Sequence, residues 1–130
     1  MKLLCLLNSG ISSPVAVHLM KQKKHEVRCI HFKVGKVKVV KGLAKELGCR
    51  LKIKRYASRV RKASNQRERK KAMLAISAKF ANKIGADALL TGDTLDGVVA
   101  SSVPIIRPLI GFNHNEIVSI AEKIRATHSD

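Results

Sequence analysis

The chain has 130 residues, of which 45% are hydrophobic, and this length and composition predict one globular domain over residues 1–130. Its formal net charge is +17, from 26 Lys and Arg against nine Asp and Glu. No apolar run reaches the roughly 18 residues that span a membrane, and the short apolar N-terminal run lacks the form of a signal peptide. We therefore expect a cytoplasmic protein without a membrane segment.

Residues 3–7 form an apolar run that predicts a buried first strand, followed by the small polar loop 8–13. A helix is expected from Pro14 to about Lys24, with Ser13 as its N-cap and Pro14 at its first position. Such a loop can direct backbone N–H groups and the positive end of a helix dipole at an anion, typically a phosphate. The alternative is a strand-to-helix turn that binds nothing.

The middle of the chain alternates strand and helix patterns. Residues 27–32 predict a second strand, and residues 36–47 have apolar side chains at helical spacing. Residues 50–56 alternate apolar and basic side chains, which is typical of a half-exposed edge strand. A polar basic stretch, 57–66, leads into a helix that ends near Ile84. The apolar side of this helix is expected to carry Met73, Ile76, Phe80, Ala81 and Ile84.

The last third of the chain predicts two more strands and a helix. Residues 87–91 form the fourth strand, which opens into the loop 92–97, and residues 103–106 form a short fifth strand. The final helix has Asn113 at its N-cap and Glu116 three residues later, which is the pattern of a capping box. Strands that alternate with helices predict the α/β class, with a doubly wound parallel sheet of about five strands.

Three loops of this predicted sheet follow a strand: 8–13, 33–36 and 92–97. The carboxyl ends of parallel strands meet at one edge of the sheet, and ligands bind there. We therefore expect the three loops to converge on one crevice. Neither G-x-x-x-x-G-K-[ST] nor G-x-G-x-x-G is present, which argues against a P-loop NTPase and a dinucleotide-binding domain. No His or Cys spacing predicts a metal site.

The three cysteines, Cys5, Cys29 and Cys49, lie within or beside predicted strands. Their odd number and their spacing fit neither a disulfide framework nor a C-x-x-C motif. We interpret them as buried, reduced thiols that pack as small apolar residues. A reactive thiol is the alternative.

The positive charge is concentrated in residues 33–71, where 16 Lys and Arg face only two acids, a net charge of +14. A one-sided block of this kind fits a polyanion, usually RNA or DNA, although a solvated basic face is the alternative. With few aromatic residues for base stacking, binding would depend on backbone phosphates and weaken with salt. We expect seven residues to contact RNA: Arg59, Arg61, Lys62, Arg67, Arg69, Lys70 and Lys71.

Residues 8–16, Asn-Ser-Gly-Ile-Ser-Ser-Pro-Val-Ala, resemble the PP-loop S-G-G-x-D-S-P-V-A of the ATP-pyrophosphatase superfamily. They are most similar to its tRNA 4-thiouridine synthetase, or thiamine-biosynthesis-type, branch. Three further stretches agree with that branch in order. These are Ile30-His31-Phe32, residues 89–95 (Leu-Leu-Thr-Gly-Asp-Thr-Leu) and residues 105–112 (Ile-Ile-Arg-Pro-Leu-Ile-Gly-Phe) with Glu116-Ile117.

This resemblance implies an adenine-nucleotide hydrolase-like fold and an enzyme that adenylates a uridine oxygen of tRNA. Pyrophosphate is released, and a sulfur donor then displaces AMP. ATP and Mg²⁺ are the implied cofactors, with Asp93 as a residue that could organise Mg²⁺ or a phosphate. Asp93 and Ser13 are the implied catalytic residues, and Phe32 is expected to flank the adenine. The implied nucleotide-binding residues are Asn8, Ser9, Gly10, Ile11, Ser12, Ser13, Phe32, Thr91 and Gly92.

The sequence also departs from the family pattern. Asn8 and Ser9 replace Ser and Gly of the PP-loop, and Ser12 replaces its acid. The chain ends before the region where other members place a sulfur-carrying cysteine, and it contains no N-terminal RNA-binding domain. We therefore expect separate RNA-binding and sulfur-carrier proteins as partners. Pairing of the chain with itself is left open.

Three functions are compatible with these features. The first is a stand-alone PP-loop subunit that activates tRNA for thiolation. The second is a catalytically reduced nucleotide- or RNA-binding module of a tRNA-modification complex, which the altered loop favours. The third is a domain that senses adenine nucleotides and has no role with RNA.

Overall fold

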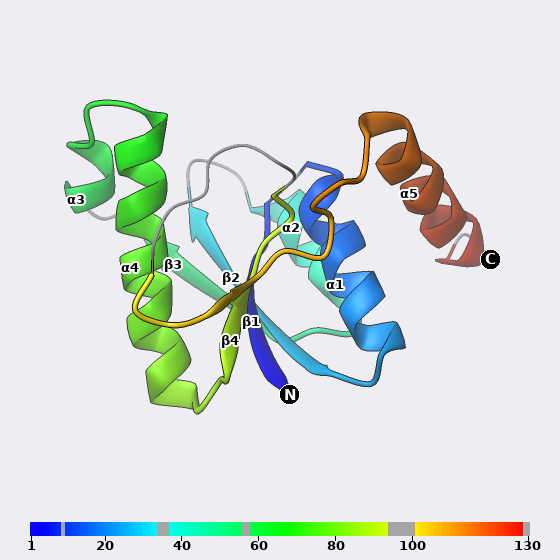
Figure 1. Cartoon of the computed structure of the whole chain (residues 1–130), viewed down its shortest axis with the longest axis horizontal. Helices are drawn as coiled ribbons and strands as arrows, with labels where there is room; N and C mark the ends of the chain where they lie inside the picture. Colours follow the sequence, from blue (N-terminus) through cyan, green and yellow to red (C-terminus); the bar gives the residue numbers. More distant parts are fainter. Residues whose placement is uncertain (9, 34–36, 56–57, 94–100, 129–130) are drawn as a thin grey trace.

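The computed structural model describes residues 1–8, 10–33, 37–55, 58–93 and 101–128. Five parallel strands form one sheet in the order β3-β2-β1-β4-β5 (Figure 1), which confirms the predicted α/β fold. In chain order the elements are β1 (Lys2–Leu6), α1 (Ser12–Gln22), β2 (Glu26–Lys33), α2 (Lys38–Glu46), β3 (Leu51–Arg55), α3 (Ser58–Arg61), α4 (Gln66–Ile84), β4 (Ala88–Leu90), β5 (Ile105–Ile106) and α5 (His114–His128).

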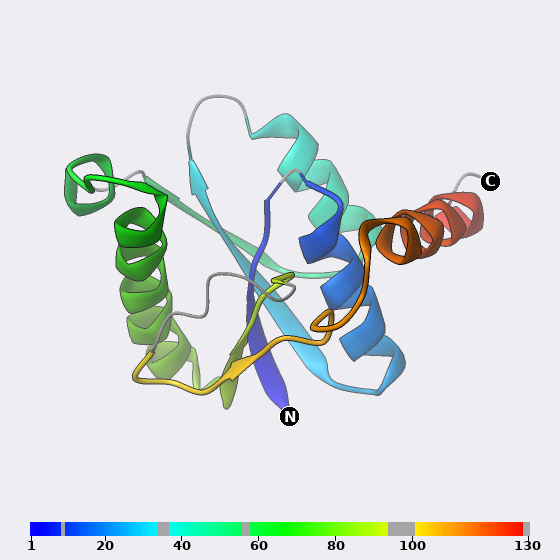
Figure 2. The same cartoon turned by 45° about the horizontal axis from the view of Figure 1, so that its top comes forward.

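Helices cover both faces of the sheet, as Figures 1 and 2 show from two directions. Side chains alternate along a strand, so β1 in the middle of the sheet contributes to two cores. Leu3 and Cys5 of β1 pack with residues of α1, α2 and α5 on one face. Leu4 packs with residues of α4 on the other face. No helix in the described ranges is both long enough and apolar enough to span a bilayer.

The expected start of α1 is wrong by two residues, and Ser13 is not its N-cap. The helix begins at Ser12, the N-cap position is Ile11, and no side chain caps it. The hydroxyl of Ser13 instead accepts a hydrogen bond from the backbone N–H of Asn8 at 3.0 Å. Pro14 still lies in the first helical turn, where its missing N–H leaves no intrahelical hydrogen bond unmade.

The region of α3 and α4 differs from the prediction in two ways. The stretch expected to be irregular contains the short helix α3, and the buried stripe of α4 consists mainly of small residues. Leu74, Ala78 and Ala81 are buried, whereas the larger Ile76 and Phe80 are only partly buried beside them. Small side chains let the helix lie close to the sheet, so the large side chains pack along its flanks. The predicted end of α4 is confirmed by Gly85, whose φ is +72°.

The cysteines are free thiols in this structure, as expected, but Cys49 is only partly buried. Parallel pairing of β1 and β2 sets Cys5 opposite Cys29, and both are buried. A hydrogen bond with the thiol of Cys29 and burial raise the pKa of Cys49 well above its usual range. A thiol that stays protonated is a poor nucleophile, which supports the packing interpretation over the reactive one.

The capping box of α5 is confirmed. The N–H of Glu116 donates to Asn113 Oδ1 at 2.8 Å, and the N–H of Asn113 donates to Glu116 Oε1 at 3.0 Å. We expect Asn113→Ala to lower the free energy of unfolding by about 1 kcal/mol, measured by urea denaturation. Asn115→Ala, an exposed change inside the same helix, is the control and should leave stability unchanged or slightly higher. An equal loss in both variants would contradict the capping role.

Candidate functional site

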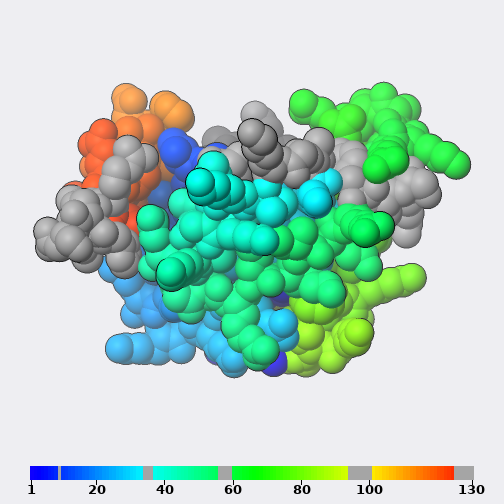
Figure 3. Space-filling view, turned by 180° about the vertical axis from the view of Figure 1, so that it is seen from behind, coloured from blue at the N-terminus to red at the C-terminus, as the bar shows by residue number. Residues whose placement is uncertain are grey.

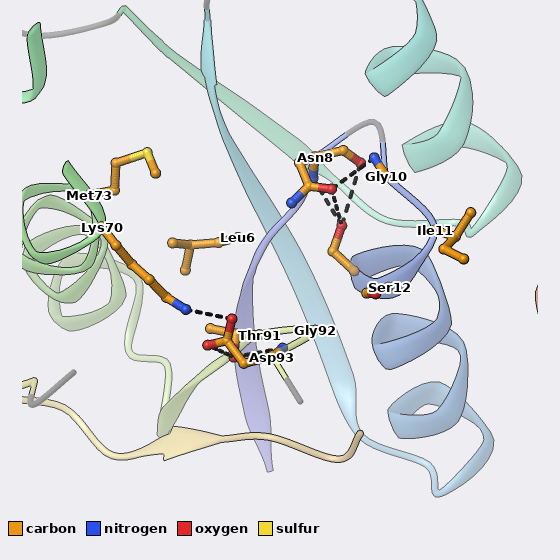
Figure 4. A pocket seen from close by; sticks show the side chains of 11 residues that line it. Leu6, Asn8, Gly10, Ile11, Ser12, Lys70, Met73, Thr91, Gly92 and Asp93 are labelled. Carbon is orange, nitrogen blue, oxygen red and sulfur yellow. Dashed lines mark hydrogen bonds and ion pairs between the residues drawn. The ribbon is translucent and has the colours of Figure 1, made fainter. Parts of the chain in front are cut away.

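A cavity of about 470 Å³ lies where β1 and β4 end, between the start of α1 and the side of α4 (Figure 4). Eight of the residues predicted from sequence line it: Asn8, Gly10, Ile11, Ser12, Ser13, Thr91, Gly92 and Asp93. The expected convergence of the loops after the first and fourth strands is therefore confirmed. Ser9, residues 34–36 and residues 94–97 lie outside the described residues.

The two loops touch at Gly92. A Cβ atom built on Gly92 would lie 2.6 Å from the carbonyl carbon of Ser12 and 2.7 Å from the backbone nitrogen of Ser13. Neither contact is with the end of a flexible side chain, so any side chain here would push backbone away. Glycine at this position thus lets the β4 loop approach the first turn of α1.

The loop after β1 is closed by the side chain of Asn8. Asn8 Oδ1 accepts hydrogen bonds from the N–H of Gly10 at 2.9 Å and from Ser13 Oγ at 3.2 Å. Figure 4 shows these interactions converging on the amide oxygen. A neutral oxygen therefore occupies donors that an anion could otherwise use. An anion that binds to the N–H of Gly10 must displace this amide.

On the opposite wall of the cavity, Asp93 joins three side chains. Lys70 Nζ of α4 lies 2.5 Å from Asp93 Oδ1, and Thr91 Oγ1 donates to Oδ2 at 2.8 Å. Arg107 Nε lies 3.6 Å from the same Oδ2. The side chains of Lys70, Asp93 and Arg107 are all mostly buried, so two cations and a hydroxyl hold one carboxylate in place.

Sequence reasoning missed two of the side chains that hold Asp93. Lys70 was expected to contact RNA on an open surface, but the structure places it in the cavity. Arg107, which appeared only within the motif 105–112, is bound to Asp93. Met73 could have indicated the position of Lys70, because it was expected on the apolar side of the helix and lies three residues after Lys70 on the same side. Both residues line the cavity.

A second hollow of about 230 Å³ adjoins the first and is largely apolar. It is lined by Leu6, Leu7, Asn8, Ile30, His31, Phe32 and Met73. Leu6, Asn8 and Met73 line both spaces, so the two form adjoining compartments of one crevice. His31 Nδ1 lies 2.8 Å from the carbonyl oxygen of Leu7; since a carbonyl only accepts, this nitrogen carries the proton. Phe32, the residue expected beside the adenine, thus lies in the apolar compartment.

The other residues expected to contact RNA differ in their exposure to solvent. Arg61, Lys62, Arg67 and Lys71 are exposed, and Lys71 Nζ lies 3.7 Å from Glu68 Oε1. Arg69 is only partly exposed. The side chain of Arg59 lies outside the described part of the chain. Together with the inward position of Lys70, this means that the predicted set does not form one outward surface.

The site gives little support for a metal ion. Among the described residues, no group of three or more His, Cys, Asp or Glu side chains is placed to hold one. Asp93, the carboxylate that was expected to organise Mg²⁺, is already engaged by Lys70, Thr91 and Arg107. The residues present therefore do not fit a Mg²⁺ site, and we derive no step through a metal.

The fold and the crevice together define the class: a doubly wound α/β domain with a two-compartment crevice at the carboxyl edge of its sheet. The family model of the thiamine biosynthesis protein (ThiI) matches residues 1–129, so the chain belongs to the ThiI family. This confirms the resemblance to the thiamine-biosynthesis-type branch of the PP-loop superfamily.

Curated relatives are named probable tRNA sulfurtransferases. The protein of Methanocaldococcus jannaschii is 29% identical, over 95% of this chain and 40% of the relative. That of Alkaliphilus metalliredigens is 33% identical, over 95% of this chain and 39% of the relative. The chain therefore spans about two fifths of the length of the curated relatives it matches.

Solved structures share the fold. A 4-thiouridine synthetase in complex with RNA and bound ATP matches with a TM-score of 0.82 and 25% identity, over 95% of this chain and 40% of that one. A predicted subunit of a tRNA methyltransferase from Methanocaldococcus jannaschii matches with a TM-score of 0.76. Its 19% identity, over 94% of this chain and 74% of that one, shows a common fold alone.

Proposed function

We propose that this chain binds ATP in the two-compartment crevice and activates tRNA for thiolation by adenylation, acting in the cytoplasm with separate RNA-binding and sulfur-carrier proteins. The proposal is carried by one observation: an apolar compartment adjoins a polar compartment that is lined by Lys70. Relatives named tRNA sulfurtransferases, and the ATP and RNA in the similar 4-thiouridine synthetase structure, support it.

The two compartments match the two halves of a nucleotide. The apolar hollow around Phe32, Leu6 and Met73 suits an adenine ring, and the polar cavity suits the phosphates. Taken together, the two adjoining volumes of about 230 and 470 Å³ fall within the usual scale of small-molecule sites. The adenine would therefore lie toward β2, and the phosphates would lie between the start of α1 and Lys70.

In the proposed reaction ATP supplies the adenylyl group that activates a uridine oxygen, and pyrophosphate departs. The ammonium of Lys70 would offset negative charge that develops on the phosphates. Asp93 would position this ammonium through their 2.5 Å contact, with Thr91 and Arg107 fixing the carboxylate. Ser13 would keep the loop in shape through its hydrogen bond with Asn8. We thus assign positioning roles to Asp93 and Ser13.

A second candidate function is a catalytically reduced binding module. The hydrogen bonds that Asn8 Oδ1 accepts within the loop favour it, because they occupy donors of the loop. Ser12 also stands where the PP-loop has an acid. Such a module would bind ATP without turning it over.

Calorimetric titration with ATP, AMP and pyrophosphate tests the proposal, with Gly10→Val as the comparison. A Cβ on Gly10 would lie 3.0 Å from Asn8 Oδ1, so the variant should disturb the loop and weaken ATP binding. Pyrophosphate release that requires an unmodified tRNA transcript would support the adenylation role. ATP binding without such release would support the binding module, and failure of all three ligands to bind would contradict both the proposed function and a nucleotide-binding module.

A further inference from the structure

An exposed basic surface follows α2 and β3 at the β3 edge of the sheet. We name it the basic edge; it consists of Lys38, Lys41, Lys45, Arg50, Lys52, Lys54 and Arg55. All seven residues are exposed, and Glu46 is the one acid in residues 38–55. Within the described part of the chain none of the seven side chains forms an ion pair. Figure 3 shows the residues of α2 and β3 in the centre of this face.

The orientation of β3 fixes where two of these lysines lie. Leu51 packs into the core on the α1 side, so Lys52 and Lys54 project from the opposite face. Their register partners on β2 are Ile30 and Phe32, which pack with residues of α4. Because α4 packs against β1 and β4, it leaves the outer strand uncovered, and both lysines are exposed. Their spacing along the strand is about 6.6 Å.

The basic edge leads directly to the crevice. Lys54 is paired with Phe32, which lines the apolar compartment. Neighbouring strands lie about 4.8 Å apart. Because β2 and β3 are parallel, Lys54 and Arg55 stand at the same end of the sheet as the crevice. A polyanion along β3 would therefore pass beside the mouth of the site.

We propose that the basic edge binds the phosphate backbone of RNA and leads a nucleotide of that RNA to the crevice. The proposal rests on the function proposed above and names a surface that differs from the α3–α4 region expected from sequence. Lysines on an edge strand protect it against pairing with another strand. That role does not explain Lys38, Lys41 and Lys45, which lie on α2. Seven cations with one acid repel one another, so their arrangement favours a bound polyanion.

The test compares two double variants that remove the same charge. Lys52→Gln/Lys54→Gln changes the basic edge, and Lys79→Gln/Lys83→Gln changes two exposed lysines of α4. Binding of an unmodified tRNA transcript is measured by fluorescence anisotropy over a series of KCl concentrations. The first variant should reduce the slope of log K against log salt by about 1.5 to 2, because two lysines would no longer neutralise RNA phosphates. The second should keep the native slope.

Equal slopes in both variants would overturn the proposal, because net charge and not the basic edge would then set the affinity. Unchanged RNA binding with weaker binding to phosphatidylglycerol vesicles would overturn it in favour of a membrane surface. ATP titration of the same variants separates this inference from the proposed function. If RNA binding depends on the edge but neither the variants nor the native chain bind ATP, the proposed function fails and the RNA surface stands.

Discussion

Lys70→Ala is expected to weaken ATP binding by about ten- to 150-fold in calorimetric titration. This range corresponds to the roughly 1.5–3 kcal/mol that a hydrogen bond to a charged group contributes. Lys70 is the one cation that lines the polar compartment among the described residues, and Asp93 holds its ammonium at 2.5 Å. Without it, phosphates placed there would face the carboxylate of Asp93 with less compensating charge.

Lys71→Ala provides a control at the neighbouring position. Lys71 is exposed and its partner is Glu68, at 3.7 Å, so the substitution removes the same charge from outside the crevice. ATP affinity should stay within about twofold of the native value, because exposed charges are strongly screened. A similar loss in both variants would mean that Lys70 acts only through net charge. Thermal melting of each variant would show whether a loss of binding follows from a loss of folding.

The sheet and the position of its ligand site could be predicted because they depend on patterns local in sequence. Apolar runs bounded by polar loops indicate buried strands, and strands alternating with helices indicate parallel crossovers. Since the carboxyl ends of parallel strands share an edge, the order of elements predicted that the loops carrying Asn8 and Asp93 line one cavity. The charged edge strand β3 was also evident, from its alternation of Leu51 and Ile53 with lysines.

Apart from the nearby Met73, nothing in the sequence indicated that Lys70 lies inward, because its position depends on which side of α4 meets the sheet. Hydrophobicity favoured the large residues Ile76 and Phe80 as the buried face, but the helix packs through Leu74, Ala78 and Ala81. This packing places Met73 and Lys70 at the crevice. Small residues score low on a hydrophobicity scale, yet they allow a helix to pack closest to the sheet. The tertiary structure is therefore needed to see which side of α4 is buried.

The hydrogen bonds between Ser13 and Asn8 could not be predicted for a similar reason. A serine just before a proline is a common N-cap, and the sequence offered no sign that its hydroxyl would bind Asn8. The structure joins Asn8, Gly10 and Ser13 in one hydrogen-bonded loop, in which the amide oxygen of Asn8, the replacement of a PP-loop serine, is an internal acceptor. The departure from the family pattern was visible in the sequence, but its effect on the loop was not.

Gly92→Ala is expected to lower the free energy of unfolding by about 1–3 kcal/mol, the usual cost of forcing atoms into a filled space. The added Cβ would lie 2.6 Å from the carbonyl carbon of Ser12, so backbone must move to accommodate it. Gly42→Ala makes the same chemical change inside α2, where no atom lies within 4 Å. It should raise stability by about 0.5–1 kcal/mol, because alanine favours a helix. Urea denaturation of both variants measures the two effects.

The same pair of variants tests whether the contact between loops shapes the ligand site. If Gly92 serves the crevice, Gly92→Ala should weaken ATP binding as well as stability, while Gly42→Ala should leave the affinity for ATP unchanged. Native stability in Gly92→Ala would contradict the close approach of Gly92 to Ser12 and Ser13. Lower stability with unchanged ATP affinity would instead show that this contact maintains the fold while the nucleotide is bound by other residues. Because the two substitutions add the same methyl group, any difference between them reports the surroundings of Gly92.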